Sequence, residues 1–328
     1  MILLHEHSIF SVRVSSLLLW RLWSSFWLVE GTAWPYSVFR ILWTIQYFDF
    51  GSINLRLILR EYDLPPLPYP WMEFFSTLPP FLWVVLSVGY LLCVPCVAVG
   101  WHTRFFQGVL AFLSPLLFVR SASLYQNHYA FFLFIAFYLS LVSTERYYSF
   151  DARRMRRRLS LKEFRRWQEE PVSLLPLRLI LLQAAFLYFF AGLTKLDSLW
   201  LARWSSSPEA IVLSEGHPLG FFWQWLIASN LAFPFLIALA CFMLLLSFGI
   251  FLGSRYPLIL LFAAVMHMGF DLSFSIMEFT WMFLSILFLA LFPSLPGGKG
   301  DRLFRSFVPF RSLAIPTQGH ASRIPHRR

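Results

Sequence analysis

The chain has 328 residues, of which 58% are apolar, 20% are aromatic and only 13% are charged. Its 38 phenylalanines and 14 tryptophans carry more apolar surface than a water-soluble globule can bury, and this hydrophobicity excludes extensive disorder. Three cysteines are too few for a disulfide scaffold of this size. The composition therefore predicts an all-α protein, a polytopic membrane bundle without a soluble domain. The formal charge of +10 is expected to lie in loops at one bilayer surface, and no nucleic-acid partner is expected.

Windows of mainly apolar residues, each about 17–25 residues long, predict about eight transmembrane helices. They lie at roughly 34–50, 78–99, 105–120, 125–143, 174–194, 231–252, 257–270 and 276–292. We divide the chain into an interfacial segment at 1–33, a transmembrane domain at 34–293 and a basic tail at 294–328 that is expected to be disordered. The Pro-rich segment 61–80 and the Trp-rich segment 196–230 are interpreted as outer loops.

The distribution of Lys and Arg predicts which way the bundle faces. Segment 144–171 holds nine basic residues and the tail after residue 292 holds seven. With eight spans, 20 of the 27 basic residues fall on the side of these two segments and only 4 on the other. Because cytoplasmic loops carry the excess of Lys and Arg, both termini of this multi-pass protein are expected in the cytoplasm. The basic run at 153–166 is interpreted as a surface that touches anionic lipid.

Polar residues in the outer halves of four different spans form the candidate site. An ionisable residue inside a membrane costs roughly 2.5–3.5 kcal/mol, so their presence in one leaflet predicts a single polar pocket that opens outward. These residues are Asn127, His128, Lys195, His267, Asp271 and Glu278. Each also has a structural interpretation on its own. His128 would be an interfacial histidine, Lys195 would extend to the headgroups, and His267 would hydrogen-bond a neighbouring helix.

Lys195 is the candidate catalytic base of this pocket. A lysine in a low-dielectric wall gives up its charge more readily than one in water, and a neutral amine can accept a proton. His128 and His267 are the candidate partners, because an imidazole can relay a proton or hydrogen-bond an oxyanion. The aromatic surroundings suit a lipid-like reactant that enters from the bilayer. No metal is expected.

Arg40 is the ionisable residue nearest the middle of the first predicted span. We expect Arg40 to hold helices together by contacting carboxylates or carbonyls. Asp49, Asp271 and Glu278 are the candidate partners.

Three blocks of sequence resemble a known family. Residues 188–200, YFFAGLTKLDSLW, resemble the segment YFYAGLxKLDxxW of vitamin K-dependent gamma-carboxylases, which belong with the wider HTTM (horizontally transferred transmembrane) proteins. Residues 127–129 followed by 145–151 resemble the NH…RYWSxD block, and residues 266–268 followed by 274–279 resemble the FHxxN…FSIGxF block. The likeness extends over roughly residues 35–293.

The resemblance implies a specific chemistry. In the carboxylases the lysine at the position of Lys195 deprotonates vitamin K hydroquinone, oxygen adds, and the strong base so formed takes a proton from the γ-carbon of a glutamate. Carbon dioxide then traps the carbanion, a carbon–carbon lyase-type reaction known as gamma-glutamyl carboxylation. Histidines at the positions of His128 and His267 support that site. Asn127, Asp271 and Glu278, the other polar residues of the predicted pocket, are the candidate cofactor-binding residues. The expected cofactor is reduced vitamin K or another quinol, with O2 and CO2, and the expected partners are the lipid bilayer and a secreted peptide or protein.

The sequence departs from the family pattern in three places. Asp271 stands near where the family often has Asn, and Met277-Glu278 replaces the usual Gly after FSI. The carboxylases also carry a large extracytoplasmic domain, and no equivalent is expected in the 36 residues after the last predicted span. Two interpretations therefore stay open: a carboxylase-like enzyme, and a non-enzymatic membrane accessory or peptide-maturation factor that retains the fold.

Overall fold

A computed structural model of the protein describes residues 30–60, 73–120, 127–206, 216–253, 256–274 and 277–291. Within these ranges, nothing is described of the side chains of residues 76, 127, 128, 206, 274 and 277–279. Most of the predicted interfacial segment 1–33, and all of the tail predicted at 294–328, lie outside the described residues.

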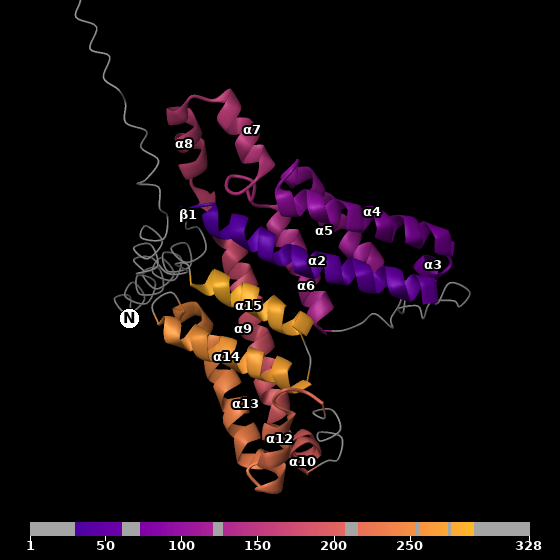
Figure 1. Ribbon diagram of the computed structural model, residues 1–328, viewed down its shortest axis with the longest axis vertical. Helices are drawn as coiled ribbons and strands as arrows, with labels where there is room; N and C mark the ends of the chain where they lie inside the picture. The colour runs from indigo at the N-terminus through magenta and orange to yellow at the C-terminus, as the bar shows by residue number, and fades with distance from the viewer. Residues whose placement is uncertain are drawn as a thin grey trace, which may run out of the picture.

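Eight helices coincide with the eight apolar windows (Figure 1). They are α2 (Trp34–Arg60), α4 (Pro80–Val99), α5 (Thr103–Val119), α6 (Asn127–Ser140), α9 (Leu175–Lys195), α13 (Ala232–Gly249), α14 (Pro257–Phe274) and α15 (Met277–Ala290). Among the described residues, α4, α9 and α13 with its 3-10 continuation η2 (Ile250–Leu252) are long and apolar enough to cross a membrane. The others are shorter or, like α2, more charged. The all-α membrane bundle is thus observed, while the number of crossings stays a prediction.

Several boundaries differ from the sequence-based expectation. Helix α2 continues ten residues beyond its predicted end at residue 50, because Arg56 and Arg60 end the apolar window without ending the helix. Short helices also occur where loops were expected, namely α3 (Glu73–Ser76), α10 (Ser198–Ser206) and α12 (Gly220–Ala228).

The basic segment between α6 and α9 folds into a helical hairpin, α7 (Phe150–Arg158) and α8 (Leu161–Glu169). Both helices begin at serines whose hydroxyls accept backbone N–H groups. The Ser149 hydroxyl accepts from the N–H of Ala152, and Ser160 forms a capping box with Glu163. These caps explain why a run so rich in arginine is helical rather than extended.

A two-stranded antiparallel sheet joins the beginnings of α2 and α9. Strand β1 (Glu30–Gly31) pairs with β2 (Val172–Ser173). The hydroxyl of Tyr36 reinforces the junction, since it donates to the carbonyl of Ser173 at 3.0 Å and accepts from the N–H of Leu177 at 3.0 Å.

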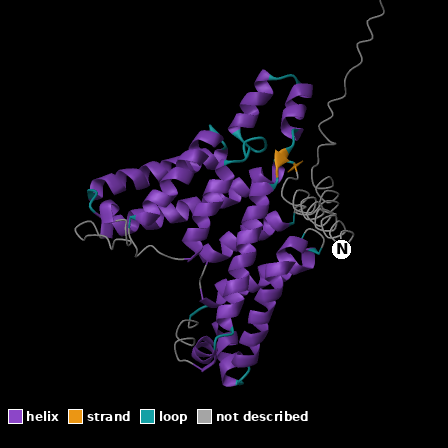
Figure 2. Ribbon diagram, turned by 180° about the vertical axis from the view of Figure 1, so that it is seen from behind, coloured by secondary structure: helices purple, strands orange, loops and turns teal. Residues whose placement is uncertain are grey.

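The helices diverge from the end of the molecule that carries α7 and α8 (Figures 1 and 2). Helices α2, α4 and α5 run together in one direction, while α9 and α13 run together in another. Helix α15 packs against α2, α9 and α14 and so joins the two groups. Aromatic side chains fill the first group, where the Phe50 and Phe132 rings stack at 4.9 Å and Trp43 stacks on Phe132 at 5.9 Å.

Candidate functional site

His267 lies at the centre of a buried cluster formed by α9, α14 and α15. Its side chain is 2% exposed, and one imidazole nitrogen, Nε2, lies 2.7 Å from the hydroxyl of Tyr188. The imidazole stacks on the ring of Phe283 with centroids 4.5 Å apart and planes 14° apart. The Thr280 hydroxyl donates to the backbone carbonyl of His267 at 3.1 Å. His267 is thus hydrogen-bonded to a neighbouring helix, which both its structural and its catalytic interpretation allow.

The local sequence of α9 explains how Tyr188 reaches this position. Ala184, Tyr188 and Gly192 lie four residues apart on one buried helical face. Gly192 permits close packing against α13, because a Cβ there would lie 2.8 Å from the side chain of Leu244. Tyr188 lies between the small residues Ala184 and Gly192 on this face, and its hydroxyl is the polar group that contacts His267.

Lys195 is the last residue of α9 and contacts α10. Its Nζ lies 5.1 Å from the ring centroid of Trp200, a cation–π arrangement that stabilises the charged ammonium. Asp197 fixes this turn, since its Oδ1 accepts from the N–H groups of Leu199 and Trp200 at 3.0 and 3.1 Å. Seven residues separate Lys195 from Tyr188, which is about 10 Å along the helix axis.

The other predicted site residues are only partly described. Asp271 follows His267 by one turn of α14 and is half-buried, and its Oδ1 has no hydrogen-bond partner among the described residues. Asn127 and His128 stand in the first turn of α6, and Glu278 stands in the first turn of α15, but their side chains lie outside the described residues. The convergence of all six residues on one pocket therefore stays a prediction.

An apolar cavity of about 390 Å³ lies between α12, α13 and α14, and Met266, the residue before His267, is part of its wall. Aromatic and thioether side chains dominate its wall, among them Trp223, Phe235, Phe242, Phe262, Met266 and Phe270. Trp200, the ring that Lys195 contacts, packs in the same hydrophobic cluster as Trp223, Met266 and Phe270. The cavity wall is therefore continuous with the residue that holds the lysine.

Arg40 has different partners from those suggested by the sequence. It is 0% exposed, and its Nη2 donates to the carbonyl of Tyr148 at 2.8 Å. The carboxylates that interact with it electrostatically are Glu145 and Asp151. The structure therefore gives Arg40 other partners than Asp49 and Asp271, because Arg40 lies on the part of α2 that faces the beginning of α7. The side chain of Glu278 lies outside the described residues, so its pairing with Arg40 is not tested. The expectation that a carbonyl and carboxylates hold it is confirmed.

Acidic side chains near Arg40 connect α5 to the segment before α7. Arg104 pairs with Glu145 at 2.9 Å. Asp151 accepts from the N–H groups of His102 and Thr103 at 3.1 and 2.8 Å, which caps the beginning of α5. The block 145–151 thus serves as a structural joint between helices in this fold.

Sequence reasoning missed Tyr188 and Phe283, two side chains that contact the imidazole of His267. Tyr188 carried a usable signal, since it is a tyrosine in an apolar helix about two turns before the candidate lysine. Phe283 carried none, because one phenylalanine among 38 has nothing in the sequence to set it apart. Within the described ranges, no group of three His, Cys, Asp or Glu side chains is placed to hold a metal ion.

These features define an all-α integral membrane protein with ionisable residues buried among apolar helices. A family model, the HTTM domain, matches residues 35–294, which is most of the chain. The chain belongs to the HTTM family, a carboxylase-associated family of membrane proteins. No curated protein and no solved structure matches it significantly.

Proposed function

We propose that the protein is a membrane-embedded, carboxylase-like enzyme that binds reduced vitamin K or another quinol, with Lys195 as general base. The observation that supports this most is the aromatic cavity of about 390 Å³ between α12, α13 and α14, whose wall includes Met266, the residue before the buried His267. Small-molecule sites are mostly apolar cavities of about 300–1,000 Å³ with a few well-placed polar groups. A quinol, which is an apolar ring with two hydroxyl groups, fits that description.

The residues near the cavity divide into those that hold a quinol and those that move its proton. Aromatic rings of α12, α13 and α14 would hold the ring of the quinol. His267 and His128 would hydrogen-bond a hydroxyl oxygen as it loses its proton, while Asn127, Asp271 and Glu278 would orient the ring. Lys195 would leave Trp200 and release its ammonium proton to bulk water, and its neutral Nζ would then accept the hydroxyl proton. When bound, the quinol supplies with O2 the basicity needed to carboxylate a glutamate of a secreted peptide with CO2.

One observation favours the second candidate function, a non-enzymatic membrane accessory or peptide-maturation factor. The Trp200 ring stabilises the ammonium form of Lys195, and a residue that keeps its charge anchors a helix end without catalysing proton transfer. The two functions differ in whether the amine must be able to lose its proton, and substitution by arginine tests that difference.

The test compares Lys195→Ala and Lys195→Arg in purified protein reconstituted with reduced vitamin K, with quinol consumption and epoxide formation as readouts. Arginine keeps the charge and the contact with Trp200 but cannot act as a base. Loss of a general base typically lowers a rate by about 10²–10⁴-fold, and we expect both variants to lose that much. The matched control is Arg203→Ala, which removes an exposed cation from α10.

Two outcomes would reject the assignment. Full activity in Lys195→Arg would show that charge alone is needed. No quinol consumption by the unsubstituted protein at saturating quinol would favour the accessory function.

A further inference from the structure

A second hollow lies at the opposite end of the molecule, between α7, α8 and the end of α4. It has a volume of about 610 Å³, and we call it the basic pocket. Arg153 and Arg156, three residues apart on α7, line it together with Arg165 of α8. Among the described residues that line it, none is acidic.

Nearby carboxylates do not compensate these three arginines, because they have other partners. Asp151 accepts from the backbone at the beginning of α5, and Glu163 accepts from the N–H and hydroxyl of Ser160. The hydrogen bonds from Ser160 hold the pKa of the Glu163 carboxyl below its ordinary value. Arg153, Arg156 and Arg165 have no carboxylate partner among the described residues, and Arg153 instead lies 5.4 Å from the ring centroid of Phe150.

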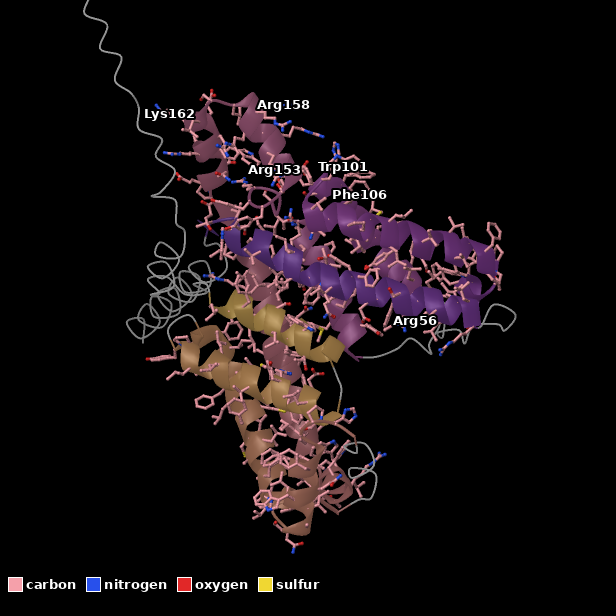
Figure 3. The ribbon with its side chains drawn as sticks, viewed as in Figure 1. Arg56, Trp101, Phe106, Arg153, Arg158 and Lys162 are labelled. Atoms are coloured by element: carbon pink, nitrogen blue, oxygen red, sulfur yellow. The ribbon has the colours of Figure 1, made fainter. Side chains whose placement is uncertain are left out.

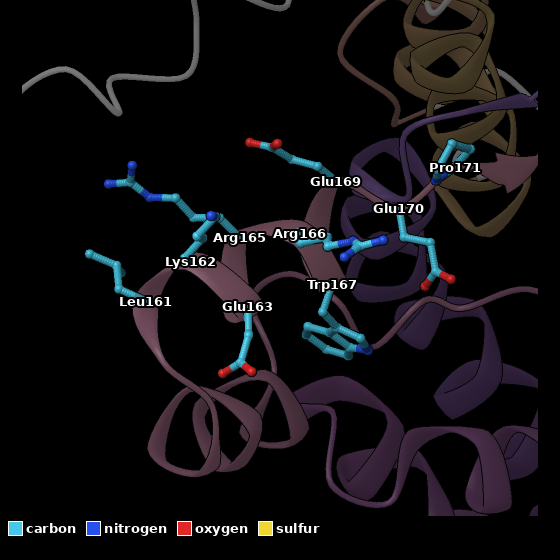
Figure 4. A pocket seen from close by; sticks show the side chains of 9 residues that line it. All are labelled: Leu161, Lys162, Glu163, Arg165, Arg166, Trp167, Glu169, Glu170 and Pro171. Atoms are coloured by element: carbon cyan, nitrogen blue, oxygen red, sulfur yellow. The ribbon is translucent and has the colours of Figure 1, made fainter.

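A neighbouring hollow on α8 of the same hairpin is lined by equal numbers of basic and acidic residues (Figure 4). It is lined by three basic residues, Lys162, Arg165 and Arg166, and by three acidic ones, Glu163, Glu169 and Glu170. Figure 4 shows Arg166 pointing toward Glu170, while Arg165 points away from both. Of these two hollows, the basic pocket is therefore the one whose lining presents uncompensated positive charge to a ligand.

The rim of the basic pocket is apolar and exposed. Val99, Phe150 and Leu161 line the pocket and are 45%, 50% and 59% exposed. Figure 3 shows Trp101 at the end of the molecule that also carries Arg153 and Arg158, and Trp101 is 44% exposed. Exposed tryptophan beside arginine is typical of the boundary between lipid tails and headgroups.

We propose that the basic pocket binds the phosphate group of an anionic phospholipid, with the acyl chains lying along Val99, Phe150 and Leu161. Guanidinium groups bind phosphate oxygens in a bidentate manner, and basic clusters next to transmembrane helices recognise anionic headgroups. The apolar rim favours a lipid over free phosphate, because only a lipid has a chain that covers it. The three arginines thus form a defined site within a hairpin whose two helices carry eight basic and three acidic residues.

The experiment titrates the purified full chain in neutral detergent with dioleoylphosphatidylglycerol and with dioleoylphosphatidylcholine, and counts bound lipids by native mass spectrometry. We expect one tightly bound phosphatidylglycerol. The triple variant R153Q/R156Q/R165Q removes the pocket arginines, and the matched control R157Q/R158Q/R166Q removes equal charge from the same two helices outside the pocket. Each basic residue near a lipid surface contributes about 1 kcal/mol, so the first variant should bind phosphatidylglycerol at least about tenfold more weakly and the second much as before.

Three results would overturn the proposal. Equal weakening in both triple variants would mean diffuse attraction without a site, and equal binding of the two lipids would mean no selectivity for the anionic headgroup. Displacement of the lipid by inorganic phosphate at matched concentration would mean that free phosphate is the ligand. All six arginines are exposed, and the pair R156Q/R165Q against R157Q/R158Q repeats the test if a triple variant fails to fold.

Discussion

At the scale of single residues, the buried imidazole of His267 depends on a partner on another helix. It lies against Phe283 on one face and beside the Tyr188 hydroxyl at its edge. A buried polar atom that loses its hydrogen-bond partner costs about 1–3 kcal/mol, so this contact connects the stability of α9 and α14 to the candidate site.

Replacing Tyr188 by phenylalanine tests that contact. The change removes one hydroxyl and leaves the ring packing, so we expect a loss of about 1–3 kcal/mol in stability, measured as a lower unfolding temperature in detergent. The matched control is Tyr138→Phe, which removes a half-buried hydroxyl that accepts from Gln183 at 3.3 Å. An equal decrease in both variants would argue against a special importance of the Tyr188–His267 pair.

At the scale of elements, the end of α4 has a backbone conformation that a side chain opposes. Gly100 has φ 71° and ψ 46°, and its N–H bonds to the carbonyls of Cys96 and Val97. A Cβ there would lie 2.3 Å from the Cβ of Ser149 and 2.4 Å from Nη1 of Arg40. The turn after α4 and the buried arginine of α2 therefore both require glycine at this position.

The substitution Gly100→Ala should therefore be destabilising. The left-handed conformation alone costs about 1–2 kcal/mol, and the two short contacts add to that. Gly89→Ala, in the middle of the same helix, is the control, since a Cβ there meets nothing within 4 Å. It should be neutral or raise stability by up to about 1 kcal/mol. Thermal unfolding of both variants in detergent provides the comparison, and similar unfolding temperatures would contradict the assigned role of Gly100.

At the scale of the whole molecule, the two ends of the bundle differ in charge and composition. The α7–α8 hairpin is rich in arginine, whereas the turn between α12 and α13 lies among tryptophans and phenylalanines. The excess of basic residues predicts a cytoplasmic hairpin and an α12–α13 turn on the outer side.

Single cysteines test that orientation in a protein whose three native cysteines are replaced by alanine. A membrane-impermeant maleimide added to intact cells should label Ser229→Cys, in the turn after α12, and should label Arg158→Cys only after the membrane is opened. Both positions are exposed, so a difference in labelling reports sidedness rather than burial. Labelling of Arg158→Cys in intact cells would invert the predicted topology and place Lys195 toward the cytoplasm.

Much of the architecture could be predicted from the sequence, because apolar windows are a local property of the chain. All eight windows coincide with helices, although α2 runs on to Arg60 and short helices occupy expected loops. The candidate site was harder to predict. His267 is buried, but its hydrogen-bond partner Tyr188 is 79 positions away in the chain. Lys195 was expected beside the histidines, and the structure shows it against Trp200.

The sequence by itself determined that the chain is an all-α membrane protein, where its apolar helices begin, and that basic charge is concentrated between the fourth and fifth windows. These properties depend on composition and on neighbours within a few residues. Only the tertiary structure decided that Arg40 joins the beginning of α7, that Tyr188 and Phe283 enclose His267, and that three arginines of the hairpin line one pocket. Such contacts depend on how each helix is rotated about its axis and against which neighbour it packs, and nearly uniform apolar helices carry little information about rotation.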